Sequence, residues 1–544
     1  MSDIGRQVFS GPTCRLSARC PKIFASLELC GLSVGDLCEV LRHFQFFSPC
    51  VSICSNKINA SRLQFGAWSI KNIMGEVALS LNELSVVELC AGLAAKKFSA
   101  VELAESLTQY IQQNSDLGSI ATFDPASYHK QAEEADVRRK AGGSKSLDGI
   151  PLILKDNIDT KDLPTTGGTG ALAGRSPSKD APAVTALKRA GAIIPAKAVM
   201  HELAFGITSN NYVTGPARNP YDKSKIPGGS SGGTGSAVSS RQFPAGLGTD
   251  TGGSVRIPSA LCGIVGFRPT VGRYPGDGVI PISKTRDTIG PMARTMQDIA
   301  LLDSVMANNA PPGRMEVNPK SIRIGLPRTR FWENLEHDVE EHGKRLIQIL
   351  EGEGVTLIEA DFPDIWDLND NTGFPIALFE VMKELPAYLQ RAGYNISIED
   401  LINGIGSPDV EGILLSQLGD EAIPQAAYSA AMEQHRPELQ KIYGDYFVEH
   451  EVDAILFPTT PLTARPIGED ETVELNGNQQ PTFPIFIRNT ELGSNIGAPG
   501  ISLPVGLGNG LPVGMEIDGI PGKDEHLIAI ASTIETLLEP VPAP

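Results

Sequence analysis

The 544-residue sequence has no uninterrupted apolar run of 18 residues, which argues against a membrane-spanning helix. Basic residues are also in short supply, because 46 Lys and Arg stand against 64 Asp and Glu and the formal net charge is −18. This balance disfavours nucleic acid or an anionic membrane surface as a main partner, since both reward clustered positive charge. With 41% hydrophobic and 20% charged residues, the composition is that of an ordinary globular protein.

Cysteine becomes scarce after the first tenth of the chain, where only Cys90 and Cys262 remain. The six earlier cysteines follow neither CxxC pairs nor zinc-site spacing, so we expect free thiols and no metal site. A reducing, cytoplasmic location fits two isolated cysteines that act as small buried hydrophobes. The early cysteines are Cys14, Cys20, Cys30, Cys38, Cys50 and Cys54.

Residues 1–73 differ in charge from the rest of the chain. They carry eight Lys and Arg against four Asp and Glu, a balance of +4 that leaves −22 on the remainder. A segment rich in serine and arginine with few acids is typical of an organelle transit peptide. An upstream extension without a role, with Met74 as the natural start, is the other interpretation. We therefore expect an N-terminal extension, targeting or disordered, before one catalytic domain at 74–544.

From residue 80 the chain alternates between helical and strand patterns. Such alternation predicts one large α/β/α sandwich with helices on both faces of a sheet. Helices are expected around 84–93, from 99 onward, and at 125–140, 180–190, 292–306 and 337–351, with a largely helical region at 375–450. Strands are expected at 119–123, 149–154, 192–195, 322–326, 354–359, 454–457, 501–504 and 514–517.

The stretch at residues 228–256 reads GGSSGGTGSAVSSRQFPAGLGTDTGGSVR and holds two serine clusters among glycines. Glycine at this density lets backbone N–H groups approach a bound group closely. A flexible linker would lack the interleaved apolar side chains of Val238, Phe243, Leu247 and Val255. The stretch therefore predicts an active site rather than a linker.

Three kinds of chemistry use such glycine-rich hydroxyl clusters. The G-x-S-x-G elbow of α/β-hydrolases needs a strand before the serine, but residues 222–227 are turn-like, so this match is weak. A phosphate-binding P-loop needs a lysine after its glycines, and neither cluster has one. Ser-Lys chemistry remains, with Lys155 as a base at the end of an apolar strand, although a surface lysine is the alternative interpretation.

Three motifs resemble the amidase signature family in sequence and in order. Residues 228–233 read GGSSGG, residues 248–256 read GTDTGGSVR and residues 266–270 read GFRPT. The family pattern runs from GGSSGG through GxDTGGS[IV]R to G[LF][KR]PT, with a lysine upstream, where this chain has Lys-Asp-Asn at 155–157. The resemblance implies the family's fold, an α/β/α sandwich around a mixed twisted sheet.

The resemblance also assigns catalytic roles. Ser254 matches the acyl nucleophile, and Lys155 matches the terminal base. Ser230 matches the bridging serine, which the family holds through a cis peptide, here Gly229–Ser230. Nothing in this scheme requires a metal or a cofactor.

The tight turn at the second cluster suits an oxyanion hole. Backbone N–H groups of four consecutive residues can surround the negative oxygen of a tetrahedral intermediate, and two glycines keep side chains out of the way. These residues are Thr251, Gly252, Gly253 and Ser254. Supporting roles in holding the turns and the serines fall to Ser231, Asp250 and Arg256.

Segments outside the signature narrow the expected substrate. Residues 200–206, 273–281 and 489–500 resemble the indoleacetamide and mandelamide hydrolase branches of the family. The resemblance implies hydrolysis of a small, aryl-substituted primary amide to an acid and ammonia. A glutamine amidotransferase A-type subunit and an inactive amidase-like binding protein are the alternatives. The sequence leaves a homodimer open.

Overall fold

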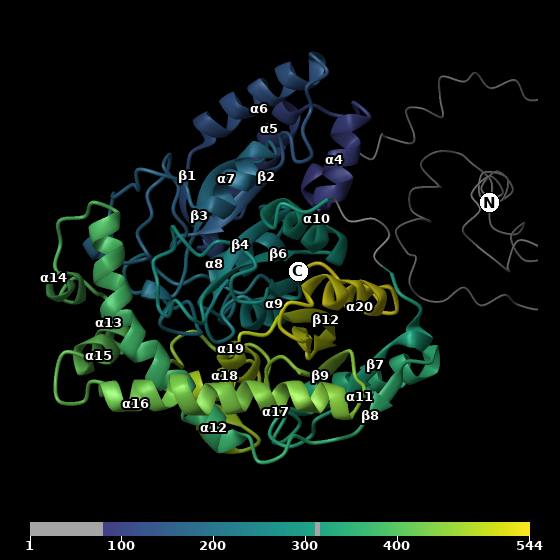
Figure 1. Cartoon of the computed structure of the whole chain (residues 1–544). Helices are drawn as coiled ribbons and strands as arrows, with labels where there is room; N and C mark the ends of the chain where they lie inside the picture. The colour runs from purple at the N-terminus through teal and green to yellow at the C-terminus, as the bar shows by residue number, and fades with distance from the viewer. Residues whose placement is uncertain (1–79, 311–315) are drawn as a thin grey trace, which may run out of the picture. The chain divides into compact units, whose positions relative to one another are not determined.

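The computed structural model describes residues 80–310 and 316–544, and the expected extension at residues 1–73 lies outside them. Residues 80–544 cluster as one compact unit, with helices around a large sheet (Figure 1). Cys90 and Cys262 are free thiols. Within the described ranges, no helix is long and apolar enough to cross a membrane.

The sheet has eleven strands in the order β1-β3-β2-β4-β6-β5-β12-β13-β9-β7-β8. It is mixed: β2 is parallel to β3 and β4, whereas β4 and β6 are antiparallel. The predicted α/β fold with a mixed sheet is therefore confirmed. The strands are β1 (Ile120–Phe123), β2 (Pro151–Lys155), β3 (Ile193–Ala198), β4 (Ala245–Asp250), β5 (Val265–Arg268), β6 (Thr288–Ala293), β7 (Arg323–Gly325), β8 (Thr356–Ile358), β9 (Ala454–Pro458), β12 (Gly500–Gly508) and β13 (Leu511–Asp518).

Alternating side chains of the strands supply two cores. In β2, Leu152 and Leu154 join the largest apolar cluster, while Ile153 packs into a cluster on the other face. This period of two is the ordinary consequence of strand geometry. The larger core is covered by α4 (Val86–Ala94), α5 (Ala100–Gln113), α6 (Pro125–Lys140), α7 (Pro182–Arg189), α10 (Met296–Met306), α11 (His337–Glu353) and α20 (Asp524–Thr536).

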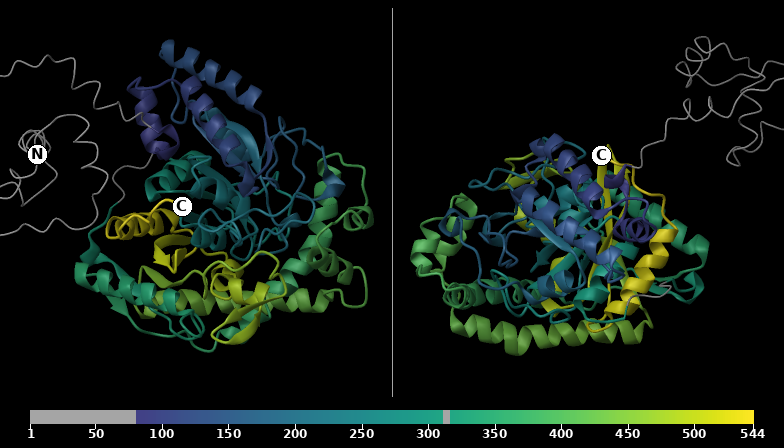
Figure 2. Two further views of the ribbon diagram at one scale, coloured as in Figure 1. Left: turned by 180° about the vertical axis from the view of Figure 1, so that it is seen from behind. Right: turned by 90° about the horizontal axis from the view of Figure 1, so that it is seen from above.

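The opposite face carries the elements that form the site. Helix α8 (Gly232–Ser239) contributes Ala237 and Val238 to the core that holds Ile153. Helix α9 (Arg256–Cys262) follows the second serine cluster. Farther along the sheet, α17 (Arg436–Glu449) packs against β9 and crosses the outside of the molecule as a long rod (Figure 2).

A group of helices in the second half of the chain has its own small core beside the sheet (Figure 1). Its longest member is α13 (Gly373–Arg391), and Val381, Leu385 and Tyr388 of this helix are buried in that core. These helices carry several residues that line the cavity described below. The others are α14 (Ile398–Ile402) and α15 (Pro408–Ser416), while α16 (Gln425–Ala430) contacts α13 outside this core.

The helix predicted at 292–306 is wrong at its start. Met292 belongs to β6 and pairs with Gly266 of β5, and α10 begins only at Met296. The Thr295 side chain caps the helix by accepting the Asp298 N–H at 3.2 Å. Apolar residues at the end of β6 fit the spacing of the following helix, but the neighbouring strands take up their backbone groups.

Candidate active site

Lys155 ends strand β2 and lies fully buried beside the first serine cluster. Its Nζ is 2.7 Å from Ser230 Oγ and 2.8 Å from Thr249 Oγ1. Burial lowers the pKa of Lys155 to about 7, although the negative charges of Asp250 and Asp287 oppose this shift. A large fraction of the lysine is therefore neutral near pH 7, as a base must be.

Strand geometry explains why this lysine meets the serine. Lys155 stands two residues after Ile153, so its side chain shares the face of the sheet on which α8 packs. Helix α8 begins directly after Ser230 and Ser231, which brings the Ser230 hydroxyl over the end of β2. The Gly229–Ser230 peptide bond is cis, as the family resemblance implies.

Ser254 sits at the second cluster, with 9% of its surface exposed. Its carbonyl accepts the Ser231 N–H at 3.2 Å, so the two serine clusters are joined through the backbone. Ser231 Oγ in turn accepts the Thr249 N–H at 3.3 Å. The Ser254 hydroxyl forms no hydrogen bond with any described residue, including Ser230. The structure thus joins Lys155 to Ser230 directly and leaves the Ser254 hydroxyl unengaged.

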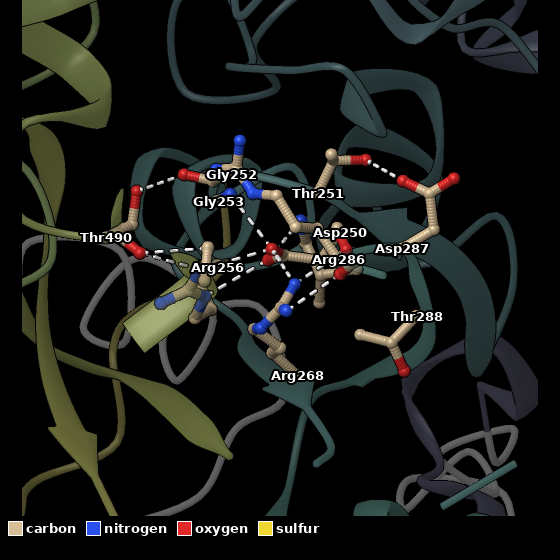
Figure 3. Close-up of polar contacts among 12 residues, drawn as sticks. Asp250, Thr251, Gly252, Gly253, Arg256, Arg268, Arg286, Asp287, Thr288 and Thr490 are labelled. Atoms are coloured by element: carbon tan, nitrogen blue, oxygen red, sulfur yellow. Dashed lines mark hydrogen bonds and ion pairs between the residues drawn. The ribbon is translucent and has the colours of Figure 1, made fainter. Parts of the chain in front are cut away.

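Asp250 is the electrostatic centre beneath the second cluster (Figure 3). Its carboxylate is fully buried between Arg256 and Arg268, with a closest ion-pair distance of 2.8 Å to Arg268. Burial alone would raise the pKa of Asp250, but the two guanidinium charges outweigh it and hold this pKa well below its usual range. The carboxylate therefore stays ionised and accepts the Gly253 N–H at 2.9 Å.

The carbonyl groups around residues 250–253 are also fixed. Arg268 Nη1 donates to the Asp250 carbonyl at 2.6 Å, and Thr490 Oγ1 donates to the Gly252 carbonyl at 2.6 Å (Figure 3). The Gly253 carbonyl accepts the Ile257 N–H at 2.8 Å. These contacts come from three different elements, so the loop is held from several sides.

The N–H groups of this loop divide into two kinds. That of Gly253 is engaged by Asp250. The N–H groups of Thr251, Gly252 and Ser254 donate to no atom of the described residues. In a trans peptide the N–H points opposite to the carbonyl, so the anchored carbonyls of Asp250 and Gly253 orient the N–H groups of Thr251 and Ser254. The loop therefore presents three free donors, not four.

A cavity of about 230 Å³ is lined in part by Ser254. Its walls are mostly apolar, with aromatic rings from three segments, and Phe374 and Phe483 contact each other with ring centroids 6.0 Å apart. Mostly apolar walls with a few placed polar groups are the usual form of a small-molecule site. The cavity is lined by Ala204, Phe205, Ile207, Thr251, Gly252, Ser254, Ile282, Arg286, Phe374, Ala377, Leu378, Ile413, Phe483, Ile487 and Glu491.

The site contains no arrangement that suggests a metal. In the part of the chain that the structure describes, no group of three or more His, Cys, Asp or Glu side chains is placed to hold a metal ion. The chemistry available from the residues present is proton transfer and nucleophilic attack by hydroxyl groups.

Comparison with known proteins gives the family. A family model described as Amidase matches residues 102–528, which include Lys155, Ser230 and Ser254. The chain belongs to the amidase family. It is a hydrolase that acts on amide C–N bonds, and the predicted family is confirmed.

Curated relatives and solved structures of this amidase agree with that placement. An indoleacetamide hydrolase of Agrobacterium vitis is 45% identical over 83% of this chain and 96% of that protein. A mandelamide hydrolase of Pseudomonas putida is 40% identical over 85% of this chain and 93% of that protein. The X-ray structure of native peptide amidase from Stenotrophomonas maltophilia has a TM-score of 0.73 at 26% identity, over 85% of this chain and 99% of that one.

Several residues that build this amidase site escaped the sequence analysis. Thr249 contacts Lys155, Arg268 anchors a loop carbonyl, and Thr490 reaches the loop from more than two hundred residues away. Arg268 lies within the GFRPT motif and Asp250 within GTDTGGSVR, so a basic and an acidic residue in neighbouring motifs were a usable signal of an ion pair. Thr249 and Thr490 lie in segments that resemble the family, at 248–256 and 489–500, but nothing in those segments indicates the contacts that their side chains make.

Proposed function

We propose that this amidase hydrolyses a small, aryl-substituted primary amide, of the kind represented by indole-3-acetamide, to a carboxylic acid and ammonia. The observation that carries the proposal is the apolar cavity, which is lined by Ser254 and by the rings of Phe205, Phe374 and Phe483. Such walls suit an aromatic group, while the polar loop suits the amide. The names of the indoleacetamide and mandelamide hydrolases support the same substrate class.

Lys155 starts the proposed reaction as the neutral base. It takes a proton from Ser230, which takes the proton of Ser254, while Ser254 Oγ forms a bond to the amide carbon. Collapse of the tetrahedral intermediate breaks the C–N bond, and Ser230 returns the proton to the departing nitrogen as ammonia leaves. Water then attacks the acyl-enzyme by the same proton route and releases the acid. The 2.7 Å contact of Lys155 Nζ with Ser230 Oγ supports the first transfer.

The transfer between the two serines requires a hydrogen bond from Ser254 to Ser230. The Ser254 hydroxyl has no other acceptor among the described residues that would hold it away. Catalytic hydrogen bonds commonly tighten only when substrate is bound, so a longer separation before binding is compatible with this role.

The oxyanion would be stabilised by the N–H groups of Thr251, Gly252 and Ser254. The Gly253 N–H, expected from the sequence to contribute, is already bound to Asp250, so we give it a positioning role. Loss of one donor in such a site typically lowers the rate by about 100- to 1,000-fold.

Ammonia release across a panel of amides tests the substrate. We expect indole-3-acetamide and mandelamide to be hydrolysed with the largest kcat/KM, and glutamine and a fatty amide to be poor substrates. Preferential hydrolysis of glutamine would instead support the amidotransferase alternative. Absence of ammonia release from every amide would support the inactive binding protein.

Covalent labelling and substitution test the residues. A fluorophosphonate should label Ser254, and Ser254→Ala should abolish both labelling and turnover. Lys155→Ala should lower kcat by about 100- to 10,000-fold, the range typical of a lost general base. Ser259→Ala is the matched control, because the hydroxyl of this buried serine donates only to the Val255 carbonyl among the described residues. Labelling of Ser230 with Ser254 untouched, or near-full activity of Lys155→Ala, would overturn the assignment.

A further inference from the structure

The peptide groups of the loop at residues 250–254 are not equally restrained. Three of them have a carbonyl fixed by a hydrogen bond, namely those of Asp250, Gly252 and Gly253. The fourth, between Thr251 and Gly252, has no such contact. Neither the Thr251 carbonyl nor the Gly252 N–H forms a hydrogen bond with any described residue.

Steric contact does not fix this peptide either. A Cβ built at Gly252 would have only Arg286 Nη2 within 4 Å, at 3.9 Å. The neighbouring Gly253, by contrast, lies directly against Thr490. A glycine with open space around it can rotate its flanking peptides at little steric cost. A contact outside this peptide is therefore needed to restrain the orientation of the Gly252 N–H.

Within the described ranges, the side chain of Thr251 provides the only hydrogen-bonded tether next to this peptide. Its hydroxyl donates to Asp287 Oδ1 at 2.6 Å (Figure 3). Asp287 precedes β6, and the antiparallel pairing of Asp250 with Thr288 places Asp287 opposite Thr251. The other carboxylate oxygen of Asp287 accepts the N–H groups of Ile282 and Ser283 at 2.9 and 3.0 Å. The acceptor is therefore itself rigid.

A direct electrostatic role for Asp287 would work against the reaction. A carboxylate near the loop repels a developing oxyanion, since like charges disfavour each other. The Thr251 hydroxyl, in turn, donates its hydrogen bond to Asp287 and therefore cannot donate one to substrate. What the pair can supply is orientation of the peptide that follows Thr251.

We propose that Asp287 is a positioning residue which, through the Thr251 hydroxyl, aims the Gly252 N–H at the carbonyl oxygen of the substrate. This inference rests on the proposed function of the loop as an oxyanion hole. It assigns a task to two side chains that touch neither the Lys155–Ser230 pair nor the Ser254 hydroxyl.

Thr251→Val tests the tether, because it removes the hydroxyl and leaves the Asp287 bonds to Ile282 and Ser283 in place. We expect kcat to fall by about 10- to 100-fold with KM little changed, less than for a donor that is removed altogether. Thr251→Ser keeps the hydroxyl and should recover at least tenfold of that loss. The double variant Asp287→Asn/Thr251→Val should have a kcat no lower than that of the less active single variant, since both substitutions remove the same tether.

An aldehyde analogue of the arylacetic acid separates positioning from a structural role. Ser254 Oγ adds to the aldehyde carbon, its proton passes to Ser230, and the former carbonyl oxygen becomes an oxyanion in the loop. The product acid binds without forming a bond to Ser254. In Thr251→Val the inhibition constant of the aldehyde should rise by the factor by which kcat/KM falls. The inhibition constant of the product acid should stay within about threefold. An equal weakening of both inhibitors, or an unchanged kcat, would overturn the proposal.

Thr270→Val is the matched control, because its hydroxyl donates to Asp524 at 2.7 Å in a similar Thr–Asp pair outside the site. It should leave kcat and both inhibition constants unchanged. Failure of the proposed function would look different, because wild-type enzyme would then release no ammonia or would not require Ser254. Failure of the positioning role would leave wild-type turnover intact and Thr251→Val fully active.

Discussion

Lys155 shows how one buried side chain can link stability to activity. Its pKa in the folded protein is about 7 because burial disfavours the charged form. The unfolded chain keeps the ordinary value near 10.5, so between these values the unfolded state binds more protons. The contribution of this residue to stability therefore rises as pH increases through that window, and the site is maintained at some expense of stability near neutral pH.

The same pKa predicts the pH dependence of turnover. Only neutral Lys155 can accept a proton, so kcat/KM should rise with pH and level off above an apparent pKa of about 7. Below that value it should fall about tenfold per pH unit. Initial rates of ammonia release between pH 5 and 9, at substrate concentrations well below KM, measure this fall in kcat/KM at low pH, the acid limb of the profile.

A buried carboxyl elsewhere controls for other titrating groups. Burial raises the pKa of Asp298 to about 6, and this residue bonds to the Val87 N–H outside the site. Asp298→Asn should leave the acid limb in place, whereas the residual activity of Lys155→Ala should lose it. An acid limb that persists near pH 7 in Lys155→Ala would assign the titration to another group.

The residues of the site were predictable where chemistry restricts the sequence to few choices. A lysine that ends an apolar strand and serines between glycines are unusual enough to identify Lys155, Ser230 and Ser254 as candidates. Positioning partners such as Asp287 and Thr490 are ordinary polar residues in ordinary surroundings. The pairing of β4 with β6 brings Asp287 to the loop, and tertiary packing brings Thr490 there from a distant part of the chain.

At the level of elements, the helix α8 owes its place to small residues. Gly233 donates its N–H to the Val199 carbonyl at 3.0 Å, at the end of β3. A Cβ at this position would press on the carbonyl oxygens of Val199 and Ser119, the latter at 2.5 Å. Because both obstacles are backbone atoms, they cannot move aside as a flexible side chain can. The serine cluster that precedes α8 is thereby held over the end of β2.

We therefore expect Gly233→Ala to destabilise the protein by about 1–3 kcal/mol, the usual range for overpacking, and to lower activity further by displacing Ser230. Gly412→Ala in α15 is the matched control, since nothing lies within 4 Å of the added methyl group. That change should stabilise the helix by up to about 1 kcal/mol. Urea unfolding measures both, and equal effects of the two substitutions would contradict the packing argument.

The elements themselves divide by how clearly their pattern repeats. Amphipathic helices such as α5, whose capping box at Ser99 and Glu102 is present, were predictable from spacing alone. Strands β4 and β6 were not, because glycine, threonine and proline interrupt their apolar alternation. The hairpin of β10 (Thr472–Leu475) and β11 (Asn478–Pro481) is polar on its exposed positions and was also missed. Pairing with neighbours, rather than local propensity, makes these segments strands.

For the whole molecule, the core of residues 80–544 includes side chains of its first α-helix. Helix α4 begins with a capping box and buries Val86, Leu89 and Leu93 in the largest apolar cluster. The Val87 N–H also donates to Asp298 of α10 at 2.9 Å. The catalytic candidates all lie later in the chain, between residues 155 and 254. The described unit thus contains the largest apolar core, the catalytic candidates and the cavity beside Ser254.

Removal of residues 1–73 should accordingly leave the enzyme folded and active. We expect a chain that begins at Met74 to keep kcat/KM for its best amide within about threefold of the full chain, with a change in Tm below the roughly 2–4 °C that 1 kcal/mol produces in a large domain. A chain that begins at Ala95 is the contrast, because it also lacks the three buried side chains of α4, each stabilising by about 1.5–3 kcal/mol. That chain should be insoluble or unfold at a much lower temperature. Loss of folding on removal of residues 1–73 alone would show that this segment belongs to the fold.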